Sequence, residues 1–263
     1  MNFISGYIKN KLDNSEKILS VFLTSGFPDL NSFPVLAEGT LNSGADILEI
    51  GIPFSDPLAD GPTIQASSQI ALNNGANIKK TLDFVRQLRK ATDKPIILMG
   101  YANPIFKYGR EKFAKDCTDA GVNGLILPDI PLEEYEDFYQ SYFKDLEVIL
   151  LATPTTRVER LIKIDEISQG FVYYVSMTAT TGKKFISDST TLEPLILASR
   201  TIRKNKMLVG FGISSQQDAK AVVPYCSGVI VGSAIIKSIK EFKGDFSKTF
   251  DLVRSIKSAI NPL

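Results

Sequence analysis

The feature that most constrains the fold is a regular alternation of short apolar runs with amphipathic stretches. Eight runs, each of about strand length and rich in β-branched residues, occur at 18–24, 46–51, 95–100, 123–128, 147–152, 171–176, 206–211 and 227–232. Most are apolar at successive positions, which is typical of strands covered on both faces. Stretches with helical spacing separate them, among them 32–44, 81–91, 110–121, 133–143 and 219–225.

Eight strands that alternate with helices over 263 residues predict an α/β fold, the (β/α)8 TIM barrel. A doubly wound open sheet is the rival, but it usually has fewer strands and often a G-x-G-x-x-G first turn, which the loop at 24–30 lacks. No linker or low-complexity tract divides the chain, so we expect a single domain over residues 1–263. Segment 2–12 is predicted to be an extra N-terminal helix at the bottom of the barrel, and 245–259 the last outer helix.

Composition excludes several classes of chemistry. The chain has no histidine, which rules out Ser-His-Asp triads, His-ligated metals and imidazole bases, so we expect no metal site. A net charge of +1 argues against nucleic acid or an anionic membrane as a partner. The two cysteines form no disulfide framework, and neither a signal peptide nor a membrane-spanning run is evident. We therefore expect a cytoplasmic protein.

Function in such barrels collects at the C-terminal ends of the strands, and the second strand carries the strongest signal there. Glu49 lies between Leu48 and Ile50 in an apolar strand, and we expect it to point into the barrel. A buried carboxylate tends to have a raised pKa, which suits a general acid–base group. The structural alternative is a buried Glu paired with a core Lys or Arg, although no strand offers an evident cation.

Two more carboxylates, Asp56 and Asp60, follow in a loop punctuated by prolines at 53, 57 and 62. Prolines restrict the loop and would hold an aspartate in one place. Turn formation explains the two aspartates equally well, since Asp is a favoured turn residue.

The last two strands end in glycine-containing segments, GFGISS at 210–215 and VGSAI at 231–235. Small residues followed by a helix N-terminus favour a phosphate, and these two loops are the usual phosphate site of such barrels. Tight strand-to-helix turns are the alternative explanation. The sixth strand runs into a Thr-rich loop, 173–185, that predicts either a lid or an exposed connection.

A Schiff-base mechanism is excluded because no predicted strand end carries a lysine; Lys94 and Lys206 stand at strand starts. Of the reaction types considered, proton transfer by carboxylates on a phosphorylated substrate is the one that these exclusions leave.

At this point the segment LEIGIPFSDPLADGP (48–62) resembles the signature of the tryptophan synthase α subunit family. FLTSGFPD (22–29), MGYANPIF (99–106), LILPDIPLEE (125–134), LLATPTT (150–156), GFGIS (210–214) and VGSAI (231–235) recur in order, each at a predicted strand end. The resemblance therefore covers nearly the whole chain.

The resemblance implies cleavage of indole-3-glycerol phosphate to indole and glyceraldehyde 3-phosphate, a retro-aldol reaction without a covalent intermediate or a cofactor in this chain. It implies that Glu49 is the acid–base residue and that Asp60 binds the indole N–H. Substrate-binding positions carried over from the family comprise Phe22, Tyr101, Tyr173, Thr181, Gly182, Phe211, Gly212, Gly232 and Ser233.

The family also implies a partner, a β subunit that holds pyridoxal phosphate, in an α–β–β–α complex. Indole would pass directly to that subunit. The implied contact residues are Pro53, Asp56, Pro57, Asn103 and Pro131.

The chain departs from the family in its sixth loop, where Gly-Val-Thr-Gly is replaced by Ala179-Thr180-Thr181-Gly182. If the first position needs a positive φ, alanine costs about 1 kcal/mol there, so we expect slower lid closure rather than lost chemistry. We also expect residues 178–186 to be mobile in the free protein. Two alternatives remain: another phosphate-binding barrel enzyme such as an isomerase, and a catalytically silent α-like subunit that activates its partner.

Overall fold

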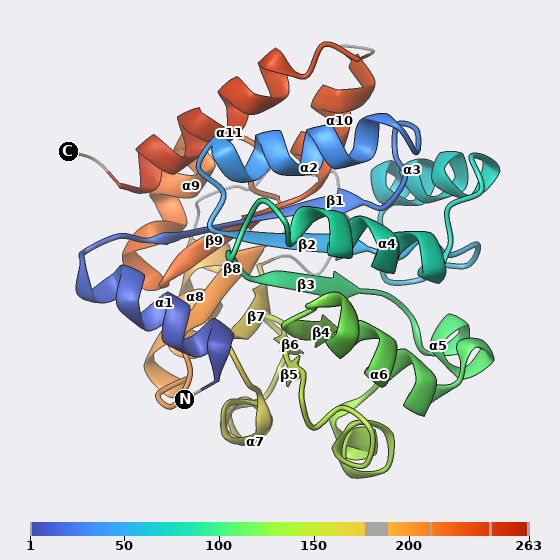
Figure 1. The fold of residues 1–263 in the computed structure, drawn as a ribbon. Helices are drawn as coiled ribbons and strands as arrows, with labels where there is room; N and C mark the ends of the chain where they lie inside the picture. The colour runs from blue at the N-terminus through green and yellow to red at the C-terminus, as the bar shows by residue number, and fades with distance from the viewer. Residues whose placement is uncertain (1, 177–188, 211, 242–243, 262–263) are drawn as a thin grey trace.

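The apolar runs form one parallel sheet that curls into a nearly closed barrel in this computed structural model, which describes residues 2–176, 189–210, 212–241 and 244–261 (Figure 1). The strand order in this nine-stranded sheet is β5-β4-β3-β2-β1-β9-β8-β7-β6. The strands are β1 (Ile18–Thr24), β2 (Ile47–Gly51), β3 (Ile96–Met99), β4 (Gly124–Ile126), β5 (Glu147–Val148), β6 (Leu150–Ala152), β7 (Val172–Val175), β8 (Met207–Gly210) and β9 (Gly228–Val231). The TIM-barrel prediction is confirmed.

The predicted fifth strand, 147–152, is divided in two. β5 pairs with β4, whereas β6 pairs with β7. Between them, the Ile149 amide donates to the Leu125 carbonyl at 3.0 Å, and the Leu150 amide donates to the Ser168 hydroxyl at 3.0 Å. One apolar run thus switches partners along its length, which explains nine strands where the sequence predicted eight.

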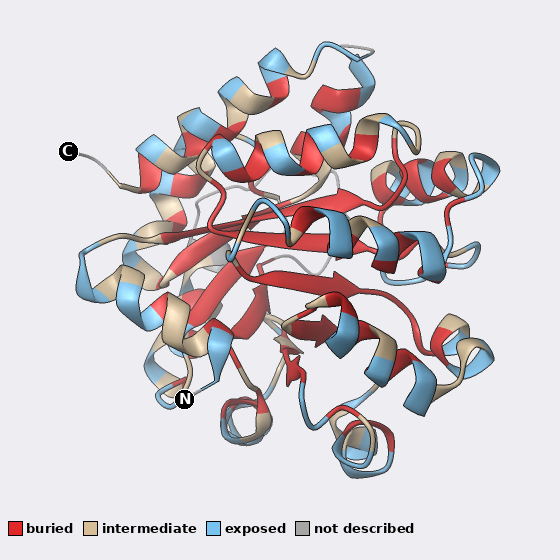
Figure 2. Ribbon diagram, in the orientation of Figure 1, coloured by how far each residue is buried: buried red, intermediate tan, exposed pale blue. Residues whose placement is uncertain are grey.

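Helices surround the barrel and turn their buried residues toward it, with exposed residues on their outer faces (Figure 2). The α-helices are α1 (Phe3–Asp13), α2 (Ser32–Asn42), α3 (Pro62–Asn73), α4 (Ile78–Leu88), α5 (Ala102–Tyr108), α6 (Arg110–Ala120), α7 (Val158–Ile167), α8 (Ser189–Thr201), α9 (Gln216–Val222), α10 (Ser233–Glu241) and α11 (Ser247–Ile260). Gly121 ends α6 in the left-handed region, and Ser215 caps α9 by accepting from the Asp218 amide.

The helix predicted over 133–143 is replaced by two shorter elements, a 3-10 turn η1 (Leu132–Glu134) and a π-helical segment η2 (Glu136–Gln140). Phe138 in η2 stacks on Phe143 beyond its end, with ring centroids at 5.9 Å and an interplanar angle of 14°. This segment is therefore not the regular α-helix that its spacing predicts. A last 3-10 turn, η3 (Val223–Tyr225), follows α9.

Helix α1 lies across the N-terminal end of the barrel, as predicted. Ile4 is fully buried, and its side chain lies against Gly124 at the start of β4 and Gly170 just before β7. The Glu147 carboxylate at the start of β5 accepts from the amides of Ile4 at 2.5 Å and Ser5 at 3.3 Å. This end of the barrel is closed, so a substrate has to enter from the opposite end.

Candidate active site

Glu49 is held inside the barrel by the register of β1 and β2. Glu49 pairs with Phe22, and residues that pair across parallel strands share a face. The Glu49 side chain is fully buried, and its Oε1 accepts a hydrogen bond from the Ser20 hydroxyl at 2.7 Å. Its Oε2 has no hydrogen-bond partner among the described residues. Burial raises the pKa of Glu49 to about 7, while the hydrogen bond from Ser20 opposes that rise.

Asp60 is the second buried carboxylate and lies one residue before the N-cap of α3. Its Oδ2 accepts a hydrogen bond from the Tyr101 hydroxyl at 2.9 Å. Burial raises the pKa of Asp60 to about 6, and the Tyr101 hydrogen bond opposes that rise. In a simple turn the Asp60 carboxylate would hydrogen-bond to backbone amides of its own loop. Here it is bonded to Tyr101, which follows β3.

Neither carboxylate has the cationic partner that the structural alternative for Glu49 invoked. In the described part of the chain no Lys or Arg forms an ion pair with Glu49 or Asp60. Lys94 lies near the closed end, where its Nζ donates to the carbonyls of Leu41 and Ala45. The two carboxylates therefore have pKa values near neutrality, where one can be protonated while the other is ionised.

Aromatic side chains lie beside these carboxylates where glycines leave room. A Cβ atom on Gly51 would lie 2.4 Å from Cζ of Phe22, and one on Gly210 would lie 2.6 Å from the Tyr173 hydroxyl oxygen. The pKa of Tyr173 is raised by burial and further by the charges of Glu49 and Asp60, which places this tyrosine close to both. The Tyr101 ring packs against Phe54 with centroids 5.4 Å apart.

Glycines at the ends of β8 and β9 form the predicted phosphate region. Gly212 has a φ of +81°, which favours glycine, and it is partly exposed. Gly232 directly precedes α10, and Ser233 is the first residue of that helix; both are partly exposed. The first amides of a helix lack partners within the helix, so this end of α10 is suited to an anion.

Three predicted substrate-binding residues, Thr181, Gly182 and Phe211, lie outside the described residues, as do Ala179 and the whole segment predicted to be mobile. Among the predicted partner contacts, Asp56, Asn103 and Pro131 are exposed, whereas Pro53 and Pro57 are buried in this chain.

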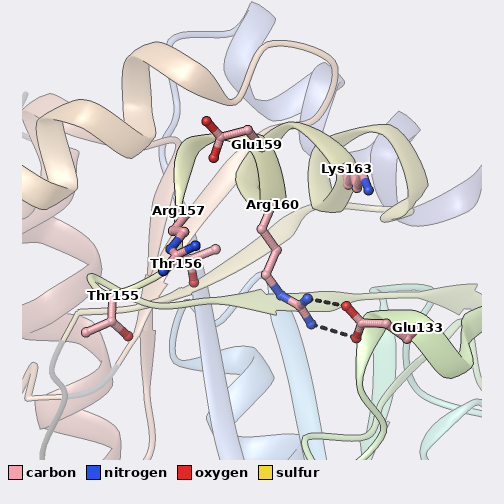
Figure 3. A pocket seen from close by; sticks show the side chains of 7 residues that line it. All are labelled: Glu133, Thr155, Thr156, Arg157, Glu159, Arg160 and Lys163. Carbon is pink, nitrogen blue, oxygen red and sulfur yellow. Dashed lines mark hydrogen bonds and ion pairs between the residues drawn. The ribbon is translucent and has the colours of Figure 1, made fainter.

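A hollow of about 570 Å³ lies near the N-terminus of α7, and none of the predicted site residues lines it (Figure 3). Its lining combines both charges: Glu133, Thr155, Thr156, Arg157, Glu159, Arg160 and Lys163. Arg160 pairs with the Glu133 carboxylate through two hydrogen bonds, one of them 3.0 Å long. We therefore place the chemistry at the carboxylates, not in this ion-paired hollow.

Ser20 is the residue that our sequence analysis missed. It interrupts an apolar strand just as Glu49 does, two positions before Phe22 and so on the same face. The same criterion that identified Glu49 would have found it. Among the described residues, no group of His, Cys, Asp and Glu side chains could hold a metal ion, and no helix is long and apolar enough to cross a membrane.

Comparisons with known proteins agree with this geometry. The chain matches the family model described as "Tryptophan synthase alpha chain" over residues 8–260. It is 44% identical over 246 residues to the tryptophan synthase alpha chain of Geotalea uraniireducens (93% of this chain, 92% of the relative) and 41% identical over 236 residues to that of Flavobacterium psychrophilum (89% and 93%). The crystal structure of tryptophan synthase subunit alpha from Legionella pneumophila superposes with a TM-score of 0.89 at 36% identity, covering 100% of both chains.

Fold and site together define a class, the TIM-barrel proteins with buried carboxylates of raised pKa inside the barrel. Within that class, the chain belongs to the tryptophan synthase alpha chain family. It is accordingly a lyase of tryptophan biosynthesis that cleaves indole-3-glycerol phosphate.

Proposed function

We propose that Glu49 and Asp60 carry out this cleavage. The observation that supports the proposal is that two buried carboxylates without cationic partners have distinct hydrogen-bond donors and pKa values of about 7 and about 6. Near pH 6.5 Glu49 is mostly protonated and Asp60 mostly ionised, so one acts as an acid while the other binds a positive group.

Glu49 alone exchanges protons with the substrate in this scheme, because it donates one proton and later accepts one. Glu49 gives its proton to the indole carbon that carries the glycerol chain, and the positive charge on the ring nitrogen is stabilised by the Asp60 carboxylate. Glu49 then accepts the proton of the adjacent glycerol hydroxyl while the carbon–carbon bond breaks. The bonding electrons return to the ring, which releases indole and an aldehyde, and Glu49 is protonated again.

The substrate binds with its indole ring beside the two carboxylates and its phosphate at the glycines that follow β8 and β9. Phe22, Tyr101 and Tyr173 lie beside the carboxylates and supply apolar ring surface for indole. Gly212, Gly232 and Ser233 bind the phosphate through backbone amides. Thr181, Gly182 and Phe211 complete this set by resemblance to the family.

A β subunit is the proposed partner, in an α–β–β–α complex, with pyridoxal phosphate held by that subunit. The exposed residues Asp56, Asn103 and Pro131 follow the neighbouring strands β2, β3 and β4, and support a contact on that side of the open end. Pro53 and Pro57, which are buried within this chain, complete the proposed contact set by resemblance to the family. We also propose that residues 1–263 form one domain and work in the cytoplasm, where Cys117 and Cys226 stay free thiols.

Family membership and the presence of Glu49 and Asp60 favour the catalytic subunit over a silent one. The test is release of indole from indole-3-glycerol phosphate by the purified chain, alone and with a β subunit added. We expect weak cleavage that the partner raises strongly, and a loss of several orders of magnitude in the Glu49→Gln variant with β-subunit binding retained. Cleavage that survives Glu49→Gln would refute the role of Glu49. No cleavage by the unaltered chain, with the complex still formed, would support the silent subunit.

A further inference from the structure

We propose that Ser20 is a positioning residue for Glu49, whose hydroxyl fixes Oε1 and leaves Oε2 as the oxygen that exchanges protons with the substrate. This inference rests on the proposed role of Glu49. Ser20 acts through the carboxylate and has no contact of its own with the reaction.

The contact is a buried one between neighbouring strands. Ser20 on β1 and Glu49 on β2 are both 0% exposed, and their oxygens are 2.7 Å apart. A hydroxyl within an apolar strand costs free energy unless it is bonded, and this one is bonded to a carboxylate that needs a donor. The pair thus satisfies the serine and fixes one carboxylate oxygen.

The proposed arrangement keeps Ser20 as the donor to Oε1 when Glu49 is neutral as well as when it is ionised. The acidic proton is then carried by Oε2, which has no partner among the residues that the structure describes. Proton donation and proton return then use the same oxygen, and the Ser20 bond keeps that oxygen from rotating away.

The hydrogen bond also lowers the pKa of Glu49, against the larger effect of burial. Among the described residues, Tyr173 from β7 is the titratable group whose pKa responds to the charge of Glu49, and it responds to the charge of Asp60 as well. Ile97, which pairs with Glu49 from β3, is apolar. A Ser20 substitution changes none of these groups, so a shift in the Glu49 titration reports on Ser20.

The experiment uses Ser20→Ala, which removes one oxygen atom. We expect kcat for indole release to fall about tenfold while KM changes by less than about twofold, because the substrate contacts remain. The pKa of Glu49 should rise by about one unit, since a donor to the charged form is lost. It is measured directly by carbon-13 NMR titration of the full chain labelled at the Glu side-chain carboxyl, with the Glu49 signal identified by its absence in Glu49→Gln.

The matched control is Ser238→Ala, which removes a buried hydroxyl that lies 2.9 Å from the Thr249 hydroxyl between α10 and α11. We expect it to leave both kcat and the Glu49 titration unchanged. The inference is overturned if Ser20→Ala leaves the Glu49 titration and kcat as they were while Glu49→Gln abolishes cleavage. Should Glu49→Gln retain cleavage, the proposed function fails instead, and the NMR titration still shows whether the Ser20 contact exists.

Discussion

The Tyr101 hydroxyl joins two loops at the open end of the barrel: it donates to Asp60 Oδ2 at 2.9 Å and accepts from the Ala59 amide at 3.2 Å. Tyr101 directly precedes α5, just after β3, so its side chain ties the loop after β2 to the neighbouring strand end. One hydroxyl therefore both places the Asp60 carboxylate and stabilises its charged form.

Tyr101→Phe should raise the pKa of Asp60, because the lost donor favours the ionised carboxylate. We expect kcat/KM to fall several-fold at pH 6 and less at pH 8, where Asp60 is ionised in either protein. Indole release measured across pH tests this. Tyr108→Phe is the control, since it removes another tyrosine–carboxylate bond, 2.6 Å to Asp116, away from the site. Equal losses in both variants would contradict the assignment.

The pH dependence of cleavage should be bell-shaped. Activity rises as Asp60 ionises at about pH 6 and falls as Glu49 loses its proton at about pH 7. The phosphate of the substrate titrates identically in every variant, so a comparison of variants separates its contribution. Tyr101→Phe is expected to move only the rising limb, and Ser20→Ala only the falling limb. A single substitution that moves both limbs equally would mean that the two carboxylates titrate as one coupled pair.

Glu49→Gln should change how stability depends on pH. The folded pKa of Glu49, about 7, lies above its ordinary value of 4.5, so between these values the folded state holds a proton that the unfolded state has released. The contribution of Glu49 to the free energy of unfolding is therefore largest below about pH 4.5 and declines by about 3 kcal/mol as the pH rises through 7. In denaturant unfolding at pH 4 and pH 8, the decline should be smaller by about 3 kcal/mol in the Gln variant than in the unaltered chain, because the raised pKa of Asp60 contributes equally to both. If the free energy of unfolding declines equally in both proteins, the pKa of Glu49 is the same in the folded and unfolded states.

Much of this architecture could be predicted from local sequence. Strand-length apolar runs predict the barrel. Glu49 stands out because burying a carboxylate in an apolar strand costs free energy, which favours a functional role. Asp60 could not be separated from a turn residue, since its role depends on Tyr101, 41 positions away. The Ser20 contact likewise depends on strand register, and a one-residue slip would turn one of the two side chains outward.

Two local predictions were overridden by tertiary contacts. The apolar pattern of the run 147–152 predicts one strand, but its two halves pair with different neighbours, which the periodicity within the run does not indicate. The stretch 133–143 has helical spacing, yet it forms the π-helical segment η2, and Phe138 within it stacks on Phe143 beyond its end. In both places the outcome is decided by packing partners that lie beyond the local pattern.

Gly51→Ala should impair substrate binding through Phe22. The added methyl would lie 2.4 Å from Phe22 Cζ and force the ring to shift, so we expect KM to rise about tenfold and the free energy of unfolding to fall by about 1–3 kcal/mol. Gly39→Ala is the matched control, because its methyl meets the Phe250 ring at 2.2 Å on the outside of the barrel. That variant should lose comparable stability with KM unchanged. If KM rises equally in both, Phe22 does not line the substrate site.

Glu147→Ala should separate stability from catalysis. The Glu147 carboxylate binds the amides of Ile4 and Ser5 at the closed end of the barrel, and its removal leaves two helix N-terminal donors without this partner. We expect a loss of about 2 kcal/mol in the free energy of unfolding, measured by urea denaturation, with kcat/KM unchanged at a temperature where the variant is folded. Glu134→Ala, an exposed carboxylate in η1, should change neither quantity appreciably. A folded Glu147→Ala variant with lower kcat would show that docking of α1 affects the carboxylates at the far end, through the β-strands that both ends share.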